Sequence, residues 1–64
     1  MSYLSVRMNM IEDSSKATSD IKRMIEAIRL NRKDQAAWLA LADAAEEAGI
    51  ETYDFRCRID EYFN

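Results

Sequence analysis

The sequence predicts a small all-α protein, on three observations. It contains no proline and a single glycine, whereas all-β folds need many turns built on these residues. Helix-favouring residues such as Ala, Glu, Lys, Leu and Met are plentiful from residue 16 to residue 48. Apolar side chains also recur at helical spacing in three successive segments. We therefore expect a small three-helix bundle, equivalent to a helical hairpin plus a third helix, preceded by an N-terminal arm.

Residues 1–14 are predicted to form this arm or a short helix. Leu4, Val6, Met8 and Met10 alternate with polar residues as in a strand, whereas Leu4, Met8 and Ile11 fit one face of a helix. A lone strand has nothing to pair with inside this chain and would need a strand from a second copy. We therefore favour a short helix or an arm that packs on the core.

Residues 15–64 are predicted to form a single helical domain. Its first helix begins at Ser15 or Ser19 and ends at Leu30. The apolar positions of this segment follow one helical face. They are Ala17, Ile21, Met24, Ile25 and Ile28.

The second helix is predicted between Asp34 and Gly49. The Asp34 carboxylate can accept the free amide hydrogens of the first turn, and Gly49 suits the left-handed position after the last turn. We expect Ile50 to fold back on that turn. The apolar positions are Ala37, Trp38, Leu41, Ala42, Ala45 and Ala48.

The third helix is predicted from residue 51 or 52 onward, with Thr52 as its N-cap. Its apolar face consists of Phe55, Ile59, Tyr62 and Phe63. A strand interpretation rests on the alternation of Tyr53, Phe55, Cys57 and Ile59, but the alternation fails at Tyr62 and Phe63, so we favour the helix.

Composition and charge limit the classes of function. Residues 1–33 carry seven basic and four acidic side chains, a net charge of +3, while residues 34–64 carry two basic and eight acidic ones, a net charge of −6. Such polarity suits a charged partner or a second copy of the chain. The lack of a long apolar run and of an export signal, together with a lone thiol, predicts a cytoplasmic protein that does not enter a membrane.

The sequence offers no set of residues for catalysis, for a metal or for a cofactor. It contains no histidine and one cysteine, Cys57, so the thiol lacks an activating base and a structural zinc site cannot be built. We expect Cys57 to be a buried apolar thiol. The chain is therefore predicted not to be an enzyme.

Candidate binding residues form an acidic, an aromatic and a basic group. Asp43, Glu46 and Glu47 share one side of the second helix, as a solvated face or a surface for a basic partner, and Tyr53, Tyr62 and Phe63 are candidate aromatic contacts. Trp38 and Phe55 are expected in the core. The basic candidates, which would contact nucleic acid, are Lys22, Arg23, Arg29, Arg32 and Lys33. Nucleic acid is the less favoured partner, because the chain is acidic overall, with a pI of about 4.8.

Part of the chain, residues 27–58, resembles the bacterial repeat-companion domain. The resemblance rests on Ala27, Ile28, Asn31, Asp34, Leu39, Ala42, Asp43, Glu46, Glu47, Gly49, Phe55, Arg56 and Arg58. It departs from the family at Leu41 and Ala44, where a tyrosine and a tryptophan are usual. A weaker resemblance, carried by Asn31, Trp38, Leu41, Ala42 and Gly49, is to a single tetratricopeptide-like unit. Both imply a helical hairpin; the first family has no established activity.

Taken together, these features predict a small interaction module or regulatory protein that binds a protein partner, one with a basic surface, and that self-associates. Two alternatives remain. One is a DNA-binding regulator that uses the basic first helix. The other is a phage-type inhibitor that occupies a basic nucleic-acid-binding surface of a host complex.

Overall fold

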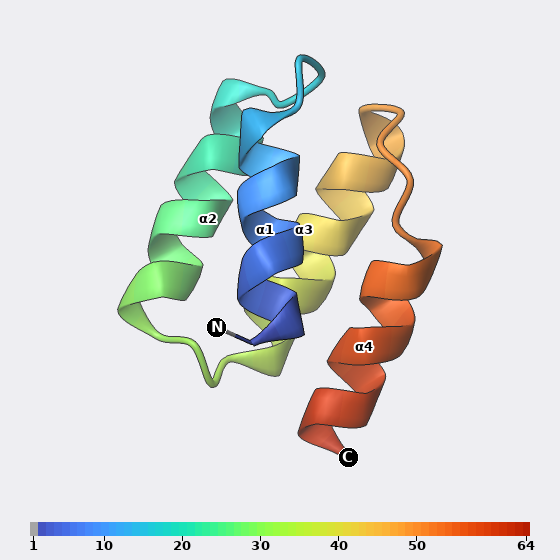
Figure 1. Ribbon diagram of the computed structural model, residues 1–64. Coiled ribbons are helices and arrows are strands. Elements are labelled where there is room, and N and C mark those ends of the chain that lie inside the picture. The colour runs from blue at the N-terminus through green and yellow to red at the C-terminus, as the bar shows by residue number, and fades with distance from the viewer. Residues whose placement is uncertain (1) are drawn as a thin grey trace.

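The computed structural model describes residues 2–64, which form four helices that run alternately up and down (Figure 1). They are α1 (Tyr3–Asp13), α2 (Ser19–Leu30), α3 (Gln35–Glu47) and α4 (Tyr53–Phe63). Each helix packs against the next, and α1 also packs against α4, which closes the bundle. The all-α class and the small helical bundle are confirmed. The segment predicted as an arm or a short helix is a helix of eleven residues, so the bundle has four helices in its described part.

The core is apolar and includes side chains from all four helices. α2 and α3 supply the predicted positions Ile21, Ile25, Ile28, Trp38, Leu41, Ala42 and Ala45, and α4 supplies Phe55 and Ile59. α1 supplies Leu4, Met8 and Ile11. The spacing of these three residues fits one face of a helix and was the alternative to the strand pattern. Residues 3–13 and residues 15–64 therefore share one core.

The α2–α3 hairpin is anchored by Trp38. Its indole is 1% exposed, meets the ring of Phe55 edge-on at 6.0 Å between centroids, and donates a hydrogen bond from Nε1 to the carbonyl oxygen of Arg32 at 2.9 Å. Buried indoles need such a partner for the N–H group. Ala42 and Ala45 are fully buried beside it, so the absence of larger side chains lets α2 and α3 approach closely.

Both predicted ends of α3 are confirmed. The Asp34 side chain accepts a hydrogen bond from the amide of Ala37 at 3.2 Å. At the other end Gly49 has φ +88°, the amide of Ile50 donates to the carbonyl of Ala45 and the amide of Gly49 donates to that of Glu46. These two bonds are the Schellman pattern, which satisfies carbonyl groups that the helix leaves free.

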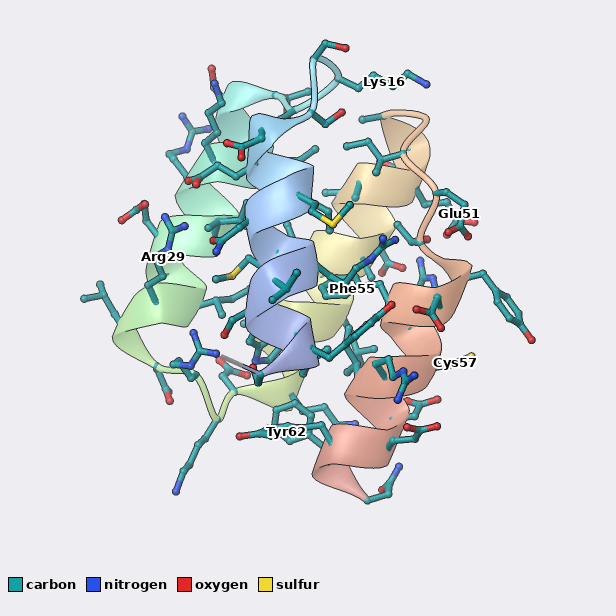
Figure 2. All side chains as sticks on the ribbon, viewed as in Figure 1. Lys16, Arg29, Glu51, Phe55, Cys57 and Tyr62 are labelled. Atoms are coloured by element: carbon teal, nitrogen blue, oxygen red, sulfur yellow. The ribbon has the colours of Figure 1, made fainter. Side chains whose placement is uncertain are left out.

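One expectation about α4 is confirmed and one is wrong. Thr52 is the N-cap residue as predicted, although its buried side chain makes no capping bond; the Glu51 carboxylate accepts the amide hydrogen of Tyr53 at 2.6 Å. Cys57 is exposed, not buried. In a helix, residues two positions apart point in nearly opposite directions, so the burial of Phe55 turns Cys57 outward (Figure 2).

Candidate interaction surfaces

The predicted acidic group is divided by an arginine of α4. The Arg56 guanidinium donates from Nη2 to Asp43 Oδ1 and to Glu46 Oε2, both at 2.6 Å, which joins α3 to α4. These carboxylates raise the pKa of Arg56 above its ordinary value. Glu47 does not join them; it lines a separate hollow with Thr18 and Met24. Asp43 and Glu46 therefore hold the bundle together, and Arg56 is a contact that the sequence analysis did not single out.

The three aromatic candidates occupy different surroundings. Tyr53 is 77% exposed and borders a hollow beside Ile50 and Arg56. Tyr62 is 57% exposed, on the flank of α4 that faces α1, and its ring meets that of Phe63 edge-on at 4.9 Å. Phe63 is half-buried and packs on the core. Of these three candidates, Tyr53 and Tyr62 therefore offer aromatic surface to a partner.

Most of the predicted basic group is engaged within the bundle. Arg23 pairs with Asp20 on the same helix, and Arg32 donates to the hydroxyl of Ser5 and lies over the Trp38 ring. Among the described residues, Lys22, Arg32 and Lys33 are the three members of the group with no ion pair in the structure. The five side chains therefore do not form a free basic face.

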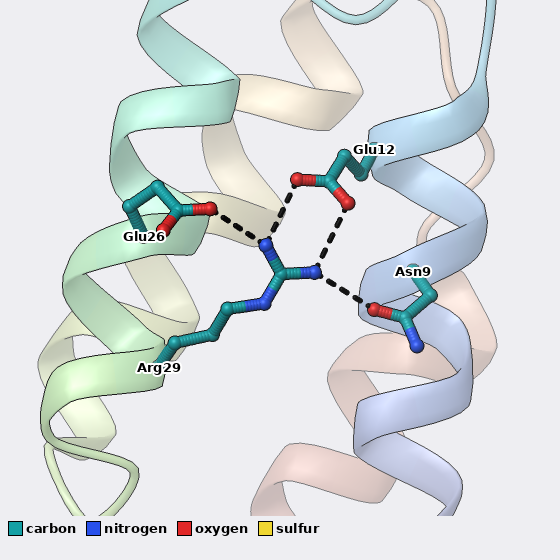
Figure 3. Close-up of polar contacts among 4 residues, drawn as sticks. All are labelled: Asn9, Glu12, Glu26 and Arg29. Atoms are coloured by element: carbon teal, nitrogen blue, oxygen red, sulfur yellow. Dashed lines mark hydrogen bonds and ion pairs between the residues drawn. The ribbon is translucent and has the colours of Figure 1, made fainter.

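Arg29, the remaining member, binds three residues at once (Figure 3). Its Nη1 and Nη2 donate to the two carboxylate oxygens of Glu12 at 3.0 Å each, Nη2 donates to Asn9 Oδ1 at 3.0 Å, and Nη1 donates to Glu26 Oε1 at 2.7 Å. Bidentate arginine–carboxylate pairs are strong and geometrically specific. The hydrogen bonds that Arg29 donates to Glu12 lower the pKa of Glu12, and those that it donates to Glu12 and Glu26 raise the pKa of Arg29. Arg29 thus holds α1 against α2.

A patch that the sequence analysis did not single out lies on the outer side of α1. Tyr3, Val6 and Met10 are spaced so that they share one face of the helix, and they are 38%, 43% and 56% exposed. Tyr62 borders the same groove as Tyr3 between α1 and α4, together with Arg58, whose guanidinium carbon lies 4.7 Å from the centre of the Tyr3 ring. We call Tyr3, Val6, Met10 and Tyr62 the outer apolar patch.

The sequence carried a signal for this patch. In α1 one apolar set, Leu4, Met8 and Ile11, is buried, while a second set, Tyr3, Val6 and Met10, lies on a different face. A helix that is apolar on more than one face is typical of burial on both sides. The alternation of Val6, Met8 and Met10 resembles a strand pattern. In a helix, the same alternation places these apolar side chains on two different faces.

Comparison with protein-family models, curated proteins and solved structures finds no match for the chain. The α2–α3 hairpin that the repeat-companion and tetratricopeptide resemblances imply is present, and membership of either family stays a hypothesis. Within residues 2–64, no helix combines the length and hydrophobicity that a membrane crossing requires. The same residues contain no cluster of three or more side chains suited to a metal ion.

Proposed function

We propose that the chain is a non-enzymatic protein–protein interaction module that binds through the outer apolar patch. The observation that supports this most is the gathering of Tyr3, Val6, Met10 and Tyr62 on the α1–α4 side of the bundle. These are four of the six large apolar side chains that the described residues expose. Isolated exposed apolar residues are ordinary, whereas a contiguous group marks a contact surface.

Charge indicates the kind of partner. On α4, Glu61 lines the groove that Tyr3 and Tyr62 border, and residues 34–64 have a net charge of −6. The Glu61 carboxylate forms an ion pair with Arg58 at 3.5 Å. A protein with an apolar spot bordered by lysine or arginine is complementary to this surface, and such complementarity speeds association and selects the partner.

DNA binding receives less support from the geometry. Both Nη groups of Arg29 are occupied by Asn9, Glu12 and Glu26, so a phosphate that bound these two groups would first have to break the contact between α1 and α2. The inhibitor alternative uses the same contact chemistry as the proposal and differs only in the identity of the partner.

A set of three tagged baits tests the proposal: the unaltered chain, a Val6→Gln/Met10→Gln variant, and a Leu30→Gln control. Leu30 is 90% exposed on α2 and lies outside the patch, so the control removes exposed apolar surface elsewhere. We expect one protein from an extract of the source cells to bind the first and third baits. Its recovery on the patch variant should fall about tenfold or more, as at interface hot spots.

The same experiment separates the alternatives. Recovery of the partner should fall at high salt and should survive nuclease treatment, because salt screens charge complementarity and no nucleic acid takes part. Equal recovery on all three baits would refute the patch as the contact surface. Loss of the partner after nuclease treatment would favour the nucleic-acid alternative.

A further inference from the structure

The inner side of α1 fits its neighbours through a small set of specific contacts. Leu4, Met8 and Ile11 enter the core at positions i, i+4 and i+7, the pattern by which an amphipathic helix binds a groove. On α2, Arg29 binds Glu12 and Asn9, and in the loop after α2, Arg32 binds the hydroxyl of Ser5. On α4, Arg58 lies over Tyr3. The name α1 seat is used below for the surface that α1 covers on α2, on α4 and on the loop after α2. This surface includes Arg29, Arg32 and Arg58.

The other three helices are joined by contacts in which α1 takes no part. Trp38 of α3 meets Phe55 of α4 and donates a hydrogen bond to the carbonyl of Arg32 in the α2–α3 loop. Arg56 of α4 binds Asp43 and Glu46 of α3. Release of α1 would leave these contacts intact and would expose the apolar part of the seat, which then needs another occupant.

Two features lower the free energy needed to release α1 from the seat. The Nε of Arg7 is buried with no hydrogen-bond acceptor among the described residues, and the nearest carboxylate oxygen, from Glu51, is 3.9 Å from Nη2. A buried donor without an acceptor loses its hydration without compensation. The segment that joins α1 to α2, residues 14–18, is held to α3 by one bond at the surface, from Lys16 Nζ to the carbonyl of Gly49 at 3.0 Å.

From these observations we infer that α1 exchanges between chains, so that the α1 seat of one copy is filled by α1 of a second copy. The occupant is defined by the structure itself, since α1 presents the three apolar anchors, the hydroxyl of Ser5 and the carboxylate of Glu12 that the seat receives. Exchange of an identical element is a low-cost route to a dimer, because no new interface has to be formed. The inference goes beyond the proposed function: it concerns the inner side of α1, and either one can fail alone.

A pair of charge-reversed variants tests this exchange. In Glu12→Arg, α1 places a cation against Arg29, and in Arg29→Glu the seat places an anion against Glu12. Within each variant chain α1 and its seat repel each other. If the two variants exchange α1, one seat pairs Arg29 with Glu12 and the other pairs the two substituted residues in reverse, so both ion pairs are present only in the exchanged heterodimer.

We expect each variant alone to melt below the unaltered chain. An equimolar mixture should form a species of twice the 7.4 kDa chain mass by light scattering, with a melting midpoint several degrees above that of either component. A dimer that associated without exchange would keep both repulsions and would show no such rise in midpoint.

Two controls keep the outcome decisive. The double variant Glu12→Arg/Arg29→Glu in a single chain restores the pair within that chain, and its folding shows that both substitutions are tolerated. The mixture of Asp20→Arg with Arg23→Glu reverses a pair that lies wholly within α2, so exchange of α1 restores nothing there. If the double variant folds while the Glu12→Arg and Arg29→Glu mixture stays monomeric, with no rise in midpoint, the exchange is refuted.

Discussion

The α2–α3 hairpin and helix α1 are held in the bundle in different ways. The hairpin has caps made by nearby residues, Asp34 before α3 and Gly49 after it, and a large indole at its centre. α1 also has a local N-cap, Ser2, but it is placed in the bundle by three apolar anchors and by side-chain hydrogen bonds to residues 17 to 27 positions away, as in Arg29 with Glu12 and Arg32 with Ser5. The hairpin is thus specified by local sequence, whereas α1 is placed by partners that only the folded chain brings together.

The largest effect is expected at Trp38, in the hairpin. Trp38→Ala removes a fully buried indole with its edge-on contact to Phe55 and its hydrogen bond to Arg32, and such truncations cost about 3–5 kcal/mol of the free energy of unfolding. A domain of this size has about 3–10 kcal/mol in total. We expect all four helices to lose stability together in thermal melts followed by circular dichroism at 222 nm. A variant as stable as the parent would refute the central role of the hairpin.

The same contrast explains which parts of the fold sequence reasoning recovers. The apolar spacing of α2 and α3 and the cap at Asp34 depend on residues within a few positions of each other, so they were predicted correctly. Cys57 was misplaced because the thiol was assigned by its residue type; its neighbour Phe55, once buried in a helix, fixes the opposite orientation. The side chain of Thr52, the N-cap of α4, makes no hydrogen bond to the first turn, and the Glu51 carboxylate accepts the amide hydrogen of Tyr53.

The candidate site was less predictable than the fold. Proximity in sequence placed Asp43, Glu46 and Glu47 in one group, but the position of Arg56 on the neighbouring helix divides them. The two apolar faces of α1 are visible in the sequence, yet which of them faces the core depends on where α2 and α4 lie. Which apolar face of α1 is buried can therefore be known only from how the helices pack in the folded chain.

An intermediate effect is expected at Met8, the most buried anchor of α1. Met8→Ala leaves a cavity under α1 and should cost about 2–3 kcal/mol, near the lower end for such truncations because α1 can shift to fill part of the space. Amide hydrogen exchange should accelerate most in residues 3–13, while α2 and α3 keep more of their protection. Val6→Ala, at an exposed position of the same helix, is the matched control. Uniform acceleration in all four helices would mean that α1 and the hairpin unfold as one unit.

The smallest effect is expected at Glu12, whose pKa is lowered chiefly by the hydrogen bonds from Arg29, with a smaller contribution from the nearby charge of Lys22. A carboxyl group whose pKa is lower in the folded chain than in the unfolded chain stabilises the fold. This stabilisation is complete at pH values above the ordinary pKa of about 4.3, and it is lost as the pH falls through the lowered pKa of the folded chain. Glu12→Gln should therefore melt slightly below the unaltered chain at pH 7, and the difference should shrink as the pH falls below about 4.

Glu26→Gln is the control for this last prediction, because Glu26 also binds Arg29 but lies on the same helix, at i and i+3. Only Glu12→Gln should speed amide exchange in α1, since of these two carboxylates only Glu12 connects α1 to α2. The difference between Glu12→Gln and the parent should also narrow in high salt, which screens exposed ion pairs. A midpoint difference that stays constant from pH 7 to pH 3 would show that Glu12 acts through packing and not through its charge, and α1 would then be held by its apolar anchors alone.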